Sequence, residues 1–255
     1  MDKKFLGVLI AFVVVVLIIA CIGLTSDDAP PVTTTVITTE PTTLAPIENA
    51  VTTEVTTEPA KKEFTTAKID YLDDALFIGD SRTVGLEMYS DAKNADYFCT
   101  VGMSSFKVFS ESAKVDGVMT SLKSLLSTKK YGKIYIMLGI NELGYNRTTS
   151  FNKYKELVDT VRELQSDAII FIQGNIHVGA SRSASDTVIN NKAINEFNSM
   201  IAELQNEEDI FYINVSECFD DSNGNLDVEY SNDGIHLHVS DYNRWIDYVL
   251  TKAIV

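Results

Sequence analysis

The fold is decided by the stretch Ala75-Leu76-Phe77-Ile78-Gly79-Asp80-Ser81-Arg82-Thr83-Val84-Gly85. An apolar run leads directly into Gly79-Asp80-Ser81, and a segment with helical spacing follows. This pattern predicts a buried strand, a glycine turn and a helix, with Ser81 at the carboxyl end of the strand, where open α/β sheets bind ligands. The first N–H groups of the helix point outward there, which suits a developing negative charge. Asp80 and Ser81 could equally serve only as helix caps, since their residue types favour that position.

Further apolar runs downstream predict the remaining strands of the same sheet. Near-continuous apolar runs are typical of parallel strands that are buried on both faces. Between them lie segments whose apolar residues recur every three or four positions, which is the spacing of a helix with one buried face. The predicted strands are 75–79, 96–101, 133–138, 168–173 and 210–215, and the predicted helices lie in 151–164, 189–204 and 242–253. The alternation predicts a doubly wound, three-layer α/β/α domain with a mostly parallel five-stranded sheet of flavodoxin-like type.

One part of this domain gives a weaker signal. Between residues 103 and 130, three leucines at helical spacing (Leu122, Leu125 and Leu126) predict a helix before the third strand. The segment 106–118 could be helix, hairpin or loop.

An apolar segment begins the chain. Residues 5–24 carry no charge and are numerous enough to span a bilayer, with two lysines before them and two aspartates after them. We expect residues 1–24 to be a membrane anchor, with the remainder outside the membrane. Ile18-Ile19-Ala20-Cys21 also resembles a bacterial lipobox, which would make Cys21 a lipid-modified N-terminus. The apolar run continues past Cys21, and this favours an uncleaved transmembrane helix.

A stalk separates the anchor from the domain. Residues 25–66 contain all five prolines of the chain and fourteen threonines, and Thr-Thr-Glu-Pro occurs twice. Such a segment lacks the apolar side chains to form a core, so we predict an extended, disordered linker. The folded domain is then expected to span 67–255.

Composition excludes several classes of function. The formal net charge of −15 argues against nucleic acid as a partner, because phosphates require a basic surface. The three cysteines are widely spaced and fit no metal pattern, and Cys99 and Cys218 are expected to be free thiols. Residues 221–227 carry oxygen side chains at alternate positions, but the glycine falls at the wrong place for a calcium loop, and Asn223-Gly224 indicates a turn. We therefore expect no metal and no cofactor.

Polar residues gather at the carboxyl ends of the predicted strands. Ser81 follows the first strand, Gly102 the second and Asn141 the third, while an Asp-x-x-His pair, Asp233 and His236, precedes the last helix. A serine hydroxyl is a weak nucleophile and needs a base, and histidine titrates near neutral pH. A nearby carboxylate can fix the tautomer of the imidazole. The set predicts acyl transfer, which needs a nucleophile, a base, an orienting carboxylate and donors for an oxyanion.

At this point the sequence resembles the SGNH (GDSL-type) hydrolase superfamily. The resemblance covers residues 73–253, and four signature blocks occur in order: GDSRTVG, TVG, LGINE and DGIHL. It implies that Ser81 is the nucleophile, that His236 is the general base and that Asp233 orients the imidazole. It also implies an oxyanion hole formed by the Ser81 N–H, the Gly102 N–H and the side-chain amide of Asn141. Gly102 could instead be only a strand-end turn, and Asn141 only a loop residue bonded to local backbone.

The sequence departs from the family pattern at two positions. Arg82 stands where leucine is usual, and Glu142 stands where aspartate is common. Arg82 and Tyr145 lie at the active edge and are candidate substrate-binding residues. His177 follows the fourth strand and is a candidate for the wall of the pocket, whereas His238 has no carboxylate at the offset seen for His236.

These features lead to one functional hypothesis and two alternatives. The chain is expected to be a membrane-anchored, extracellular serine esterase that removes short acyl groups, chiefly acetyl, from a small-molecule or polysaccharide ester, and a monomer is assumed. A lipase, lysophospholipase or thioesterase of the same fold is one alternative. The other is a surface carbohydrate-binding module that retained the fold without catalysis.

Overall fold

The computed structural model describes residues 62–255. The predicted anchor and nearly all of the predicted linker lie outside the described residues. Within 62–255, no helix is both long and apolar enough to cross a membrane.

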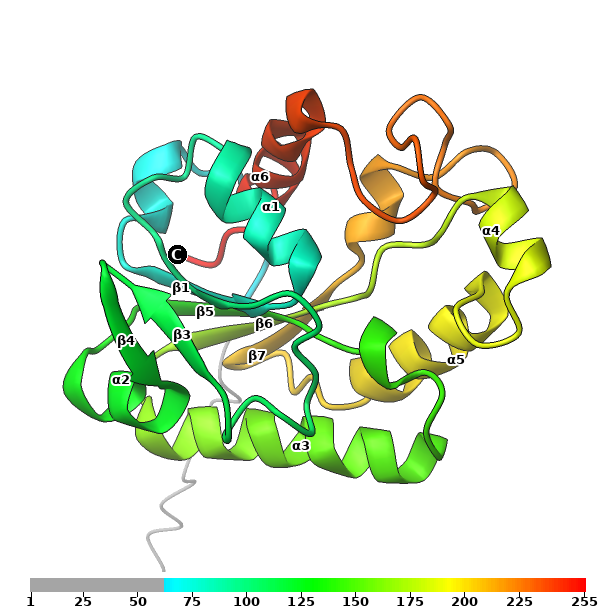
Figure 1. Cartoon of the computed structure of the whole chain (residues 1–255). Coiled ribbons are helices and arrows are strands. Elements are labelled where there is room, and N and C mark those ends of the chain that lie inside the picture. The colour runs from blue at the N-terminus through cyan, green and yellow to red at the C-terminus, as the bar shows by residue number, and fades with distance from the viewer. Residues whose placement is uncertain (1–61) are drawn as a thin grey trace, which may run out of the picture. The chain divides into compact units, whose positions relative to one another are not determined.

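A parallel five-stranded sheet forms the middle of the domain (Figure 1). Its strands are β1 (Ala75–Gly79), β2 (Asp96–Cys99), β5 (Lys133–Met137), β6 (Ile169–Gln173) and β7 (Ile210–Ile213), in the order β2-β1-β5-β6-β7. Every neighbouring pair is parallel. Because β1 lies between β2 and β5, the segments that follow these three strands meet at one edge of the sheet. The predicted strands and sheet type are confirmed, although several strands end one or two residues earlier than predicted.

Helices cover both faces of the sheet (Figure 1). α1 (Ser81–Tyr89) and α6 (Tyr242–Leu250) pack on one face, and α2 (Leu122–Thr128), α3 (Arg147–Leu164) and α5 (Asn191–Ala202) pack on the other. Successive strand residues point to opposite faces. In β1, therefore, Leu76 and Ile78 join the core beneath α2, α3 and α5, whereas Phe77 joins the core beneath α1 and α6. The predicted three layers and helices are confirmed.

A row of stacked aromatic rings crosses the sheet on the α1 and α6 side. The ring of Tyr135 in β5 stacks on Phe77 of β1, with centroids 4.7 Å apart, and on Phe171 of β6, with centroids 4.6 Å apart. The rings occupy equivalent positions on neighbouring strands, so the parallel register brings them together. This row packs β1, β5 and β6 against one another on that face of the sheet.

One hairpin was among the alternatives left open by the sequence, and one short helix was not predicted. The segment left open by the sequence contains a hairpin of β3 (Ser112–Val115) and β4 (Val118–Ser121), and its turn residues Asp116 and Gly117 both have positive φ. That is the backbone of the type I′ turn, for which Asp-Gly is a favoured pair. The short helix α4 (Ala180–Ser185) buries none of its residues, so it has no apolar stripe that a sequence pattern could reveal.

The domain begins slightly before the predicted boundary at residues 66/67. Thr65 forms an antiparallel bridge with Ala253 near the C-terminus, and the ring of Phe64 lies 5.7 Å from that of Phe211. The predicted linker 25–66 therefore includes a few residues that belong to the folded domain.

The remaining short elements complete the described chain. Turns of 3₁₀-helix span η1 (Ile69–Leu72), η2 (Ile140–Glu142), η3 (Val215–Cys218) and η4 (Val239–Asp241). Asn223-Gly224 forms the predicted turn: Asp221 Oδ1 accepts the N–H groups of Asn223 and Asn225, and Gly224 has a φ of +73°. Cys99 and Cys218 are free thiols.

Candidate active site

The turn between β1 and α1 presents Ser81. Asp80 caps the helix, because its Oδ1 accepts the backbone N–H of Arg82 at 3.0 Å. Gly79 is required by a close approach: a Cβ there would lie 1.9 Å from Oγ1 of Thr83. Ser81 is the first residue of α1 and is half-buried at the edge of the sheet.

Ser81, His236 and Asp233 form one chain of hydrogen bonds. Oγ of Ser81 lies 3.0 Å from Nε2 of His236, and Nδ1 of His236 lies 2.7 Å from Oδ2 of Asp233. An ionised carboxylate can only accept, so Nδ1–H donates to Asp233 and Nε2 is left to accept the serine proton. The side chain of His236 is 44 % exposed, so the reacting end of this chain is open to solvent.

A tight local turn fixes Asp233 relative to His236. Oδ1 of Asp233 accepts the N–H groups of Ile235 at 2.9 Å and His236 at 2.8 Å, while Gly234 between them has a φ of +72°. Partial burial alone would raise the pKa of Asp233. The bonds from the His236 ring and from these backbone N–H groups outweigh that effect and hold the pKa well below its ordinary value. Asp233 is therefore a carboxylate at neutral pH.

The three predicted oxyanion donors follow three neighbouring strands. Ser81 lies after β1, Gly102 after β2 and Asn141 after β5, with β1 in the middle. Gly102 has a φ of +78°, a conformation that favours glycine. Nδ2 of Asn141 donates to the carbonyl of Met103 at 2.8 Å, and within residues 62–255 the other N–H of this amide has no partner. One hydrogen bond thus orients the amide across two loops and leaves a second donor for a ligand.

Glu142 fastens the loop that carries Gly102. It is fully buried, and its Oε1 accepts both the backbone N–H and the hydroxyl of Ser105, at 3.0 and 2.8 Å. Burial raises the pKa of this carboxyl, although the bonds from Ser105 oppose that effect. The sequence identified Glu142 only as a departure from the family pattern and gave no sign of this contact.

The structure corrects the prediction for Arg82. The side chain is 1 % exposed and turns back beneath the turn between β1 and α1, where it pairs with Asp80 and bonds Asn175. It therefore has no surface with which to contact a substrate.

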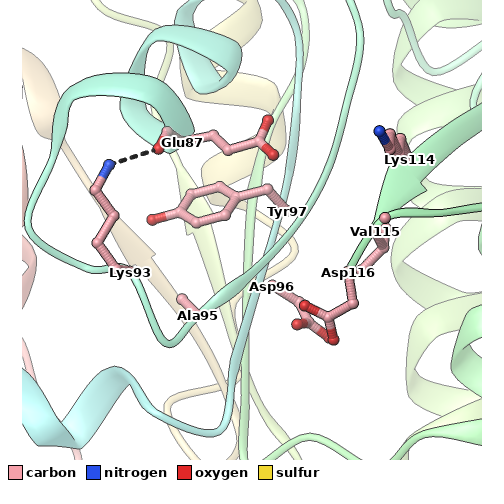
Figure 2. A pocket seen from close by; sticks show the side chains of 9 residues that line it. Glu87, Lys93, Ala95, Asp96, Tyr97, Lys114, Val115 and Asp116 are labelled. Carbon is pink, nitrogen blue, oxygen red and sulfur yellow. Dashed lines mark hydrogen bonds between the residues drawn. The ribbon is translucent and has the colours of Figure 1, made fainter.

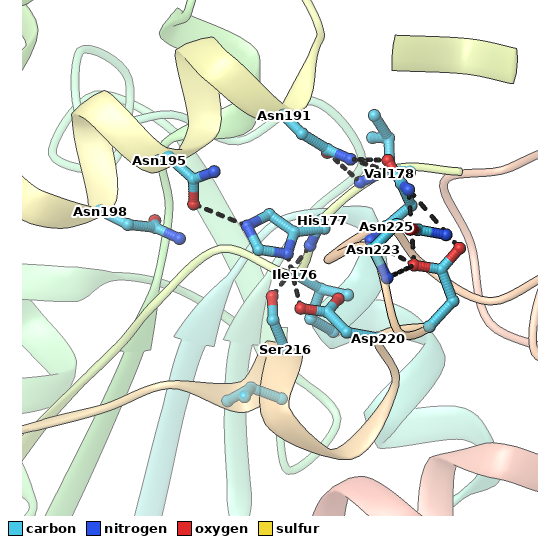
Figure 3. A network of polar contacts seen from close by, with 12 residues as sticks. Ile176, His177, Val178, Asn191, Asn195, Asn198, Ser216, Asp220, Asn223 and Asn225 are labelled. Carbon is cyan, nitrogen blue, oxygen red and sulfur yellow. Dashed lines mark hydrogen bonds and ion pairs between the residues drawn. The ribbon is translucent and has the colours of Figure 1, made fainter. Parts of the chain in front are cut away.

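The structure also corrects the prediction for His177. The residue is buried, and both ring nitrogens are occupied: Nδ1 lies 2.8 Å from Oδ2 of Asp220, and Nε2 lies 2.7 Å from Oδ1 of Asn195 (Figure 3). Burial alone would lower the pKa of His177, but its bonds to Asp220 and Asn195 and the Asp220 charge raise it overall. His177 is a structural residue that joins β6, α5 and the segment after η3.

Tyr145 remains a candidate for the pocket rim. Its side chain is 64 % exposed, and its ring lies 4.9 Å from that of Phe106. Phe106 belongs to the loop held by Glu142, and sequence reasoning missed it because no periodic pattern covers that loop. His238 is half-buried, 3.8 Å from Asp241, and contacts none of the other candidates.

Two cavities of the domain differ in how they lie relative to this arrangement. One of about 230 Å³ is bordered by Asp233 and by the start of α4, with Arg182, Ser181 and Asn232 among its lining residues. A larger one of about 370 Å³ is lined by Glu87, Lys93 and the amino end of β2 (Figure 2). The larger cavity is at the wrong end of the strand to serve Ser81, so only the smaller one adjoins the candidate site. Sequence reasoning did not find Arg182, because α4 gave no pattern.

Comparisons with known proteins identify the family of this chain and the proteins that share its fold. The family model of the GDSL-like lipase/acylhydrolase family matches residues 77–242. No curated protein matches the sequence. Among solved structures, the fold is similar to a protein named "putative platelet activating factor" from Streptococcus pneumonia, with a TM-score of 0.54 and 20 % identity over 69 % of this chain and 81 % of that one. It is also similar to a GDSL-like lipase from Bacteroides thetaiotaomicron, with a TM-score of 0.52 and 13 % identity over 73 % of this chain and 91 % of that one. The chain belongs to the GDSL-like lipase/acylhydrolase family and is a hydrolase of carboxylic esters.

Proposed function

We propose that the protein is a membrane-anchored, extracellular serine esterase that removes short acyl groups, chiefly acetyl, from a polysaccharide. The observation that carries the catalytic part is the hydrogen-bonded chain from Oγ of Ser81 through His236 to Asp233, at 3.0 and 2.7 Å. It lies at the sheet edge where Gly102 and Asn141 follow the ends of β2 and β5.

In the proposed reaction, Oγ of Ser81 attacks the ester carbonyl while Nε2 of His236 takes the hydroxyl proton. The carbonyl oxygen becomes an oxyanion and accepts hydrogen bonds from the N–H groups of Ser81 and Gly102 and from the amide of Asn141. When the intermediate collapses, the imidazolium returns the proton to the leaving alcohol and an acyl-serine remains. Water then attacks this ester with His236 again as the base, which releases the carboxylic acid and restores Ser81.

The choice of a polysaccharide rests on the alcohol side of the site. The leaving alcohol must lie near His236, since that residue protonates it. The cavity of about 230 Å³ beside Asp233 is on this side, and its lining combines polar residues such as Arg182 with the apolar side chains of Leu226 and Val228. Polar side chains beside an apolar wall suit a sugar ring, because such a ring has both hydroxyl groups and an apolar face.

The location rests on the sequence before the domain. Residues 1–24 are long and apolar enough for an anchor, either as an uncleaved helix or through a lipid on Cys21, and 25–66 have the composition of a spacer. An anchored enzyme on a spacer could reach polymers at the cell surface.

Hydrolysis of p-nitrophenyl acetate tests the enzymatic part of this proposal. The full-length chain in detergent should release p-nitrophenol, and the Ser81→Ala variant should not. Equal rates for the two proteins would exclude Ser81 as the nucleophile. An inactive wild type that still binds acetylated polysaccharide would favour the binding-module alternative.

The substrate class needs a separate measurement. Acetate release from an acetylated polysaccharide should exceed release of fatty acid from a lysophospholipid at equal ester concentration. The reverse order would favour the lipase alternative, and rapid hydrolysis of an acyl thioester alone would favour a thioesterase.

A further inference from the structure

We propose that Arg82 is a positioning residue of the esterase site. It neutralises the charge of the buried Asp80 and connects the turn that carries Ser81 to the end of β5, the strand that Asn141 follows. The proposal rests on the proposed role of Ser81 as the nucleophile. Arg82 itself touches no reacting atom, so its effect would pass through its partners.

A first set of hydrogen bonds joins the two residues on either side of Ser81. Nε of Arg82 donates to Oδ1 of Asp80 at 3.1 Å, and Nη2 donates to Oδ2 at 2.9 Å, so the guanidinium and the carboxylate meet edge to edge. The backbone N–H of Arg82 also donates to Oδ1 at 3.0 Å. Ser81 is the residue between these two partners. Three hydrogen bonds between its neighbours therefore fix the backbone from which Oγ projects.

A second set of hydrogen bonds connects Arg82 to the ends of β6 and β5. Nη2 of Arg82 donates to Oδ1 of Asn175, two residues after β6, at 2.8 Å. Nδ2 of Asn175 in turn donates to the carbonyl of Leu138, directly after β5, at 3.0 Å. Leu138 precedes Asn141 by three residues. Gly139 makes this approach possible, because a Cβ there would lie 2.4 Å from Nδ2 of Asn175. Arg82 thus links the end of β1 directly to the segment after β6, and through Asn175 to the end of β5.

Burial makes the charge of Arg82 important. Asp80 is 0 % and Arg82 1 % exposed, so neither group has water to screen its charge. Without the guanidinium, a bare carboxylate would lie one residue from the place where the oxyanion develops. It would oppose that charge and would also move toward solvent, taking the turn with it. Removing both charges should therefore do less harm than removing the arginine alone.

The test compares Arg82→Leu, Arg82→Lys and the double variant Asp80→Asn/Arg82→Leu in the full-length chain. For each, kcat and KM for p-nitrophenyl acetate are measured per active site, with the sites counted by fluorophosphonate titration. Counting sites removes the effect of misfolded protein, which a purely structural role would produce. Arg162→Leu is the matched control. Arg162 also pairs with an aspartate, since its Nη2 lies 3.3 Å from Oδ2 of Asp209, but this pair lies at the amino end of β7 rather than beside Ser81.

We expect Arg82→Leu to lower kcat per site by about 10²-fold, as a shift of about 1 Å in a nucleophile can, with KM changed by less than about threefold. The double variant should recover at least about tenfold of that loss, because the unpaired charge is gone. Arg82→Lys should fall between wild type and Arg82→Leu, since lysine keeps the charge and loses the fork. Arg162→Leu should retain the wild-type kcat per site.

Several outcomes would overturn the proposal. A wild-type kcat per site in Arg82→Leu would show that Arg82 has only a structural role. If Arg82→Leu does not fold, the other two variants decide. A double variant without detectable activity, or an Arg82→Lys variant with wild-type kcat and KM, would overturn the proposal. A wild type without esterase activity would overturn the proposed function together with this inference, whereas the results above would overturn the inference alone.

Discussion

The described part of the protein contains two histidine–aspartate pairs of nearly equal geometry and very different surroundings. In one, Nδ1 of His236 lies 2.7 Å from Asp233, and in the other Nδ1 of His177 lies 2.8 Å from Asp220. The other ring nitrogen of His236 faces the hydroxyl of Ser81, whereas that of His177 faces the amide oxygen of Asn195. The His236 side chain is 44 % exposed and that of His177 is 9 % exposed.

The difference shows that the pair itself does not make a catalytic site. His236 can exchange a proton because its partner at Nε2 is a hydroxyl that can lose one, at a surface that substrate can reach. His177 has acceptors on both sides, so protonation of its ring completes two hydrogen bonds and brings no reactive group into play. The same two residue types thus form the proposed catalytic pair in one place and a buried structural link in the other.

The largest expected effect is on activity at the first pair. His236→Ala and Ser81→Ala should each lower kcat for p-nitrophenyl acetate by about 10⁴-fold or more, because the nucleophile loses its base or is absent. His177→Ala should leave kcat per titrated site within about threefold of wild type, since His177 touches no reacting atom. A loss at His177 as large as that at His236 would remove the distinction between the two pairs.

Asp233 should come next. Asp233→Asn should lower kcat by about 10⁴-fold, because an amide can hold the imidazole in the wrong tautomer and cannot stabilise the imidazolium. Raising the pH should recover part of this loss as hydroxide-dependent routes compete. Asp220→Asn is the matched variant in the second pair and should show no comparable loss of kcat.

Asn141→Ala should have a smaller effect, a decrease in kcat of about 10²–10³-fold with KM nearly unchanged. The amide would act on the oxyanion, and the ground-state ester carries no such charge. Steady-state kinetics on p-nitrophenyl acetate separate the two constants, and raising the pH should restore nothing. A higher KM with an intact kcat would make Asn141 a ground-state binding residue instead.

The sheet, its helices and the first pair could be predicted because each of them leaves a local pattern in the sequence. Near-continuous apolar runs indicate buried parallel strands, and the ends of such strands share one edge of the sheet. Asp233 and His236 could be assigned because they are three residues apart, and their contact depends on a local turn.

The second pair and the Arg82 contact could not be predicted in the same way. Asp220 is 43 residues from His177, so no local pattern joins them. Position at the sheet edge also does not give side-chain direction: His177 and Arg82 follow strands as Ser81 does, yet both point into the protein. Arginine is rarely buried, so its residue type suggested a surface role. The β3–β4 hairpin carried a visible Asp-Gly signal, but its strands were too short to confirm it.

We expect the second pair, His177 and Asp220, to affect the free energy of unfolding rather than kcat. Because the pKa of His177 is raised in the folded protein, its stabilising contribution is complete below the ordinary histidine pKa and is lost as the pH rises through the raised value. His177→Gln should therefore lower the free energy of unfolding by roughly 1–3 kcal/mol near pH 5.5. The difference from wild type should shrink by pH 9, as measured by urea denaturation. A difference that grows with pH would contradict the direction of this shift.

The smallest expected effect is on the preference for acyl-chain length, through Tyr145 at the rim of the candidate site. If Tyr145 and Phe106 narrow the acyl side, acetyl and butyryl esters should be hydrolysed faster than octanoyl esters. Tyr145→Ala should then reduce this preference by a few-fold, as removing a hydrophobic contact of one or two methylene groups does. Tyr89→Ala is the control, since Tyr89 is also exposed and lies near another ring, at the far end of α1. A rate that rises steadily with acyl length in the wild type would favour a lipase.

The central claim is that only the first pair activates a serine, and a fluorophosphonate probe tests it most directly. The probe reacts with serines whose hydroxyl is activated by a base. We expect peptide mapping of the labelled full-length chain to find the probe on Ser81 alone, with labelling lost in Ser81→Ala and His236→Ala and retained in His177→Ala. Labelling that survives Ser81→Ala, or that disappears in His177→Ala while the protein remains folded, would contradict the account.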